Sequence, residues 1–105
     1  MVENDDGASG RYNYVMRNAD LPGADLIDAG LADLANRTES DESLLVSMAA
    51  PRLRALGFDV PEPFPDAELR LYGRLSVRHG AAAHARYNAL VRRLVSFQRA
   101  AACVR

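Results

Sequence analysis

The chain has 105 residues, of which 49% are hydrophobic and 26% charged, so it has the length and composition of a single globular domain. It contains no run of eighteen uncharged apolar residues, and its acidic start, Met-Val-Glu-Asn-Asp-Asp, is unlike a secretory signal. These features exclude a fibrous, disordered or membrane-spanning protein. We therefore expect a cytoplasmic protein with one modest core.

The residue types that usually carry cofactors and metals are scarce. Cys103 is the single cysteine, and the two histidines, His79 and His84, lie five residues apart with no acidic residue after Glu68. This pattern excludes an internal disulfide and a helical metal site. No glycine-rich phosphate loop or serine triad pattern occurs either. We expect no metal and no cofactor, and the chain is interpreted as non-catalytic.

Charge is strongly segregated along the chain. Residues 1–50 contain ten acidic residues and three arginines, whereas residues 51–105 contain four acidic residues and ten arginines. Lysine is absent, and no acidic residue follows Glu68. This asymmetry is the most unusual feature of the sequence.

Two regions follow from the pattern of apolar residues. Residues 1–20 are predicted to be a flexible, acidic N-terminal tail, and residues 21–105 a single helical domain. Within the tail, Tyr12, Tyr14 and Met16 are apolar enough to order upon binding. Pro22-Gly23 marks a turn into the domain.

The first two helices are predicted from residue spacing. Apolar residues at Ile27, Leu31 and Leu34 predict a helix over residues 24–36. A second helix is expected to begin near Ser40 or Asp41, as N-cap, and to kink or break at Pro51. Its end is predicted at Gly57, in the left-handed position of a Schellman cap, with Phe58 folding back.

The second half of the domain is also predicted to be helical. Prolines 61, 63 and 65 favour an extended strap, after which Asp66 is expected to cap a third helix that ends near His79. The fourth and longest helix covers about residues 81–103, with one apolar half that suggests the centre of the core. The predicted fold is thus all-α: a compact four-helix bundle with a proline-rich strap between helices 2 and 3 and a disordered acidic tail.

The best candidate for a binding surface is the arginine-rich face of the third and fourth helices. If exposed, its side chains could hold phosphates, and binding would weaken with salt. Alternatively, the acidic residues of the first two helices could neutralise the arginines within the fold or across a dimer. The candidate residues are Arg70, Arg74, Arg78, Arg86, Asn88, Arg92, Arg93 and Arg99.

One spacing resembles a known group of enzymes. Arg74 with His79, and Arg78 with His84, match an arginine followed by four to six residues and a histidine, which resembles the HEPN group of helical ribonucleases. The resemblance implies a histidine general acid beside a phosphate-holding arginine. At this arginine content such spacings also arise by chance, and Gly80 interrupts the helix that should carry both residues.

Three hypotheses for function remain open. The leading one is a non-catalytic helical protein-interaction module, of an adaptor, antitoxin-like or immunity-like kind, that self-associates as a homodimer. The alternative is a nucleic-acid-binding protein that uses the arginine face, and the third is a small HEPN-like ribonuclease. Burial of the arginines against acidic residues distinguishes the first two hypotheses, because an arginine paired with an acidic residue is unavailable to phosphate. No membrane partner is expected.

Overall fold

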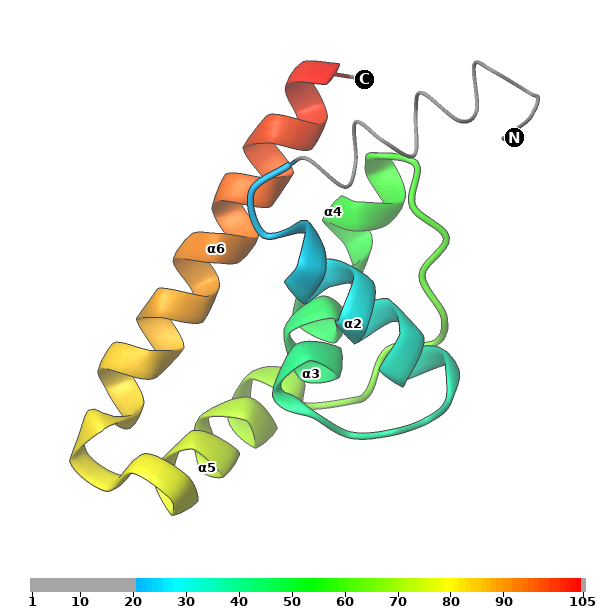
Figure 1. Ribbon diagram of the computed structural model, residues 1–105. Helices are drawn as coiled ribbons and strands as arrows, with labels where there is room; N and C mark the ends of the chain where they lie inside the picture. Colours follow the sequence, from blue (N-terminus) through cyan, green and yellow to red (C-terminus); the bar gives the residue numbers. More distant parts are fainter. Residues whose placement is uncertain (1–20, 105) are drawn as a thin grey trace, which may run out of the picture.

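The computed structural model describes residues 21–104 and contains helices and no strands in that range (Figure 1). The predicted flexible tail, residues 1–20, lies outside the described residues. The predicted compact all-α fold is confirmed, with the expected second helix divided into α3 and α4. The elements are α2 (Ala24–Ala35), α3 (Asp41–Met48), α4 (Ala50–Ala55), α5 (Ala67–His79), a 3₁₀ turn (Gly80–Ala82) and α6 (Ala83–Val104). None of the described helices is long and apolar enough to cross a membrane.

The expected cap at the start of the second helix is confirmed. Ser40 is the N-cap of α3, and its Oγ accepts a hydrogen bond from the backbone N–H of Ser43 at 3.0 Å. In return the Ser40 N–H donates to Ser43 Oγ at 2.8 Å, which completes a capping box. Ser40 also donates its hydroxyl proton to Asp33 of α2 at 2.8 Å, so the cap joins the first two helices.

The core is centred on α3 rather than on the last helix. Five consecutive residues of α3, from Ser43 to Ser47, are buried, whereas α6 buries only four of its 22 residues. The expectation that the longest helix would be central was wrong. Length and a clean apolar half do not determine burial, because α6 contacts α5 along one part and the body along another, and solvent covers the rest (Figure 1).

Pro51 separates α3 from α4, as predicted. It lies in the first turn of α4, where backbone N–H groups have no acceptor within the helix, so the N–H that proline lacks costs no helical hydrogen bond. The Schellman cap is also confirmed: Phe58 N–H bonds to Leu53 O at 3.0 Å and Gly57 N–H to Arg54 O at 2.9 Å, with Gly57 at φ 99°. The Phe58 ring then packs 5.5 Å from that of Phe97 in α6.

The connection from α4 to α5 runs over residues 56–66 without regular structure. Val60 is buried within it, and Arg54 donates to the carbonyl oxygens of Val60 and Pro61. Asp66 occupies the N-cap of α5, as expected, but its side chain makes no capping hydrogen bond. The reason is its left-handed backbone (φ 53°), which differs from the extended conformation of a capping residue.

The two C-terminal helices form a hairpin. Gly80, at φ 53°, breaks the helix between α5 and α6, as the sequence suggested. In Figure 1 this hairpin extends away from the body formed by α2, α3 and α4. The molecule is correspondingly elongated, with extents of 48 × 25 × 25 Å, and the hairpin leaves both helices with large uncovered faces.

Candidate functional site

The arginines of α5 are neutralised within the fold. Arg74 Nε lies 3.0 Å from Asp41 Oδ1, Arg78 donates to the other oxygen of the same carboxylate, and Arg70 lies 3.2 Å from Glu39. Burial of Asp41 opposes ionisation, but the adjacent Arg78 and Arg74 outweigh it and lower the pKa of this carboxyl. These three arginines, predicted as part of a binding surface, join α5 to α3 and to the segment just before it.

Arg93 of α6 is paired in the same way. Its Nη2 lies 2.9 Å from Asp25 Oδ1 in the first turn of α2. The hydrogen bond from Arg93 lowers the pKa of Asp25. This ion pair lies where α2 and α6 meet. Because both side chains are largely exposed, it contributes little to the stability of the fold. Four of the seven candidate arginines therefore have an acidic partner.

Arg86, Arg92 and Arg99 remain as unpaired candidates. All three are exposed on α6, and none makes an ion pair with another residue in the range 21–104. The amide of Asn88, the eighth candidate, is 3.2 Å from His84 Nε2. The structure thus divides the predicted surface into a neutralised part and three free arginines.

In the two arginine and histidine spacings, both arginines contact an acidic residue. Arg74 and Arg78 are directed to Asp41 of α3, whereas His84 is exposed, bonded to Asn88, and lies 6.4 Å from the Tyr72 ring. The break at Gly80 separates the two arginines from His84. A general acid beside a phosphate-holding arginine would need both side chains on one side of the hairpin.

Sequence reasoning missed a second surface, made of exposed apolar residues. Leu69 and Tyr72 of α5 are 75% and 38% exposed, while Leu71 and Leu75 are buried. Val77 is 89% exposed. A helical projection of the sequence indicates the same division, since Leu69 and Leu71 are about 200° apart at 100° per residue and cannot share a face.

Tyr72 belongs to a small aromatic contact between α5 and α6. Its ring centroid is 5.6 Å from that of Tyr87, which is half-buried. Burial and the nearby Glu68 carboxylate raise the pKa of Tyr87, so its hydroxyl stays neutral and remains a hydrogen-bond donor. This contact brings Glu68, Tyr72 and Tyr87 to the same side of the hairpin.

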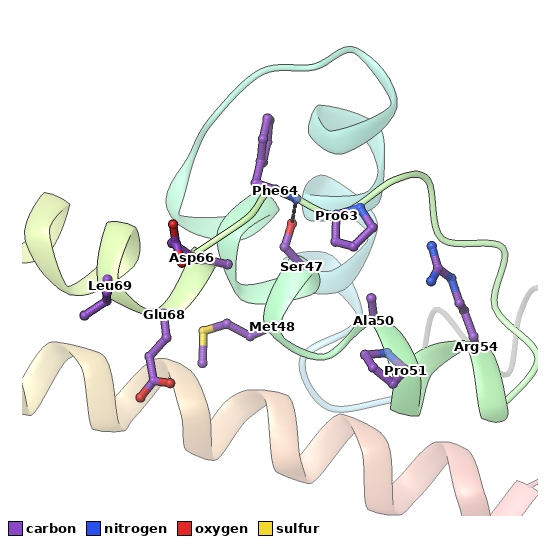
Figure 2. A pocket seen from close by; sticks show the side chains of 11 residues that line it. Ser47, Met48, Ala50, Pro51, Arg54, Pro63, Phe64, Asp66, Glu68 and Leu69 are labelled. Atoms are coloured by element: carbon purple, nitrogen blue, oxygen red, sulfur yellow. Dashed lines mark hydrogen bonds between the residues drawn. The ribbon is translucent and has the colours of Figure 1, made fainter.

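A groove of about 620 Å³ lies across the ends of α3, α4 and α5 and includes Glu68 and Leu69 in its lining. Figure 2 shows Met48 and Glu68 pointing to the side of α6, with Leu69 at one end and Arg54 at the other. We define the apolar face as the side chains that the groove and the aromatic contact bring together: Met48, Pro51, Leu69, Tyr72 and Tyr87. Its acidic residues are Asp66 and Glu68.

The one serine in the groove is structural. Ser47 Oγ donates to the carbonyl oxygen of Ser43 at 2.8 Å and accepts from the Phe64 N–H at 3.0 Å (Figure 2). Its hydroxyl proton and lone pair are thus both engaged by the backbone. The described residues also contain no group of three His, Cys, Asp or Glu side chains suited to a metal ion.

Comparisons of the chain with models of protein families, with curated proteins and with solved structures found no match. Function is therefore inferred from the two surfaces described above.

Proposed function

We propose that this protein is a non-catalytic helical interaction module that self-associates through the apolar face. The observation that supports this proposal is the exposure of Leu69 and Tyr72 beside the half-buried Met48 and Tyr87, on a hairpin that extends from the body. A contiguous apolar patch on a small protein is typical of a protein contact. The aromatic pair supplies the residue type that contributes most to such contacts.

A second copy fits this face better than an unrelated partner. In a twofold dimer the same patch meets itself, so an apolar centre with few charges is self-complementary. Leu69 and Tyr72 would lie at the centre, and Asp66 and Glu68 at the solvated rim. A small helical domain also gains core area by association, which α6 needs, since it buries only Ala83, Leu94, Phe97 and Ala101.

The test is the molar mass in solution across a range of protein concentrations, by sedimentation equilibrium. The wild type is expected to be dimeric. The variant Leu69→Glu places a charge at the predicted centre without disturbing the core, because this side chain is 75% exposed. We expect it to be monomeric with unchanged helix content by circular dichroism.

Val77→Glu is the matched control. Val77 is also an exposed apolar residue of α5, but it lies about 80° from Leu69 around the helix, beside Arg74 and Arg78. This variant should dimerise as the wild type does. A wild type that stays monomeric at all concentrations, or equal dissociation by both variants, would reject self-association through the apolar face.

Nucleic-acid binding is the second candidate, and it is supported by the three unpaired arginines. With at most three phosphate contacts, the slope of log affinity against log salt on duplex DNA would be no steeper than about −2.7. Binding to a mixed pool of RNA and DNA at low and at physiological salt tests it. Loss of binding in Arg86→Gln/Arg92→Gln/Arg99→Gln would support it, and no binding at either salt would reject it.

A further inference from the structure

Two of the free arginines, Arg92 and Arg99, lie along one exposed strip of α6. They alternate there with the small residues Ala89, Ser96 and Cys103, and all five positions lie within about 80° of one another at 100° per residue, whereas Arg86 lies about 120° from Arg92. We call this set the arginine strip. Because the intervening side chains are small, a second segment of chain can approach the helix closely between the arginines.

A groove of about 500 Å³ lies on this strip, bounded by residues at the start of the described chain. Its lining is Pro22, Gly23, Ala89, Arg92, Arg93 and Ser96. Gly23 packs tightly on α6, since a Cβ atom built there would be 2.9 Å from the Arg93 carbonyl oxygen. The described chain therefore begins directly beside Arg92 and Arg93.

We propose that the arginine strip is a binding surface for an acidic segment, and that its occupant is the N-terminal segment of the same chain, residues 1–10. This surface is distinct from the apolar face, so the proposal does not depend on self-association.

Charge complementarity supports this occupant. Residues 1–10 contain Glu3, Asp5 and Asp6 and no basic residue, whereas the strip presents two arginines without an acidic partner in the described residues. Asp25 of α2 is already held by the neighbouring Arg93. Pairs of this kind are individually weak at a surface, but two pairs on one tethered segment act together.

The length of chain also fits. Fourteen residue steps join Asp6 to Asp20, which span up to about 45 Å when extended. The 22 residues of α6 measure about 33 Å along the helix axis. Because the described chain begins beside Arg92, the acidic residues can reach both Arg92 and Arg99.

Tethering favours the same chain over other acidic partners. A segment attached to the domain has a high effective concentration at the strip, about millimolar for a short flexible connection, which a free partner must exceed. A nucleic acid or the N-terminal segment of a second copy would have to displace it.

The exposed Cys103 lies at one end of the strip and allows a direct test. A nitroxide spin label on this single cysteine broadens the NMR signals of nearby residues. In full-length, ¹⁵N-labelled protein at about 0.01 M salt we expect broadening of the backbone signals of residues 1–10. It should disappear at about 1 M salt, where the Debye length falls to about 3 Å.

Arginine variants test which side chains are responsible. Arg92→Gln/Arg99→Gln should remove the broadening, and Arg92→Gln alone should reduce it. Arg52→Gln is the matched control, because Arg52 is exposed on a different helix, α4. It should leave the broadening unchanged, and all variants should keep the helix content of the wild type.

Two results would overturn the proposal. The first is no broadening of residues 1–10 at low salt, which would leave the strip open to a nucleic acid. The second comes from mixing spin-labelled, unenriched protein with unlabelled ¹⁵N protein: equal broadening there would assign the strip to a second copy's segment. Repeating the experiment in Leu69→Glu separates this outcome from dimerisation through the apolar face.

Discussion

Arg74 Nε of α5 lies 3.0 Å from Asp41 Oδ1 in the first turn of α3, and this contact joins the acidic half of the sequence to the basic half. Asp41 also accepts from Arg78, and its charge suits the positive N-terminus of α3. We expect Asp41→Asn to lower the free energy of unfolding by about 1 kcal/mol, since Asp41 is partly buried but both arginines face solvent. Urea denaturation monitored by circular dichroism measures this change.

Asp28→Asn is the control for Asp41→Asn. Asp28 is an exposed acid in the middle of α2, away from the helix start, and it makes no ion pair in the described part of the chain. Its replacement should change stability by less than about 0.5 kcal/mol. If the two variants were equally stable, the contact between Asp41 and the arginines would be energetically neutral.

The lowered pKa of Asp41 also predicts how stability depends on pH. In the unfolded chain this carboxyl titrates near its ordinary value of 3.8, and in the folded protein at a lower pH. As the pH falls below 3.8, Asp41 therefore binds a proton more readily in the unfolded state than in the folded state. The stabilising contribution of Asp41 is lost as a result. The stability difference between wild type and Asp41→Asn should be constant above about pH 5 and shrink steadily towards pH 2. A difference that grew on acidification would contradict the assignment.

Local signals in the sequence were sufficient to predict most of the fold. Ser40, Pro51, Gly57 and Gly80 mark helix starts, breaks and ends through their own backbone chemistry, and the structure has a helix boundary within two residues of each of them. The relative burial of the helices depends instead on contacts between distant residues. For that reason α3, short and with serines at positions 43 and 47, was not recognised as the central helix.

The candidate surface was harder to predict for a related reason. The sequence showed seven arginines on two helices, but whether an arginine is free depends on which acid the fold places beside it. Asp41 and Glu39 neutralise the arginines of α5 because α3 packs on α5, a contact between segments about thirty residues apart. The exposure of Leu69 was accessible from helical geometry, whereas the pairing of Arg93 with Asp25 required the fold itself.

Ser47 supplies a prediction about the core. Its buried hydroxyl bonds to Ser43 O and accepts from the Phe64 N–H, and so ties the connection before α5 to α3. Ser47→Ala leaves that N–H without its partner, which should cost about 1–3 kcal/mol of stability. Ser76→Ala, at an exposed position of α5, should be nearly neutral. Thermal and urea unfolding of both variants distinguish a structural hydroxyl from a dispensable one.

Two glycines in helices are predicted to respond to alanine in opposite directions. A Cβ atom at Gly30 in α2 would lie 2.5 Å from both the Glu42 carbonyl oxygen and Val46 Cγ2 of α3. Because backbone cannot move aside easily, Gly30→Ala should separate α2 from α3 and lower stability by about 1–3 kcal/mol, despite the better helix propensity of alanine.

At Gly73 in α5, by contrast, no atom lies within 4 Å of the added Cβ. Gly73→Ala should therefore raise stability by about 0.5–1 kcal/mol, since only the propensity gain remains. Urea unfolding of the two variants, measured together, compares the same substitution in a packed and an open setting. If both substitutions raised stability equally, α2 and α3 would not approach as closely as the contacts of Gly30 indicate. The position of Asp33 in α2 beside Ser40, the N-cap of α3, would then have to be revised as well.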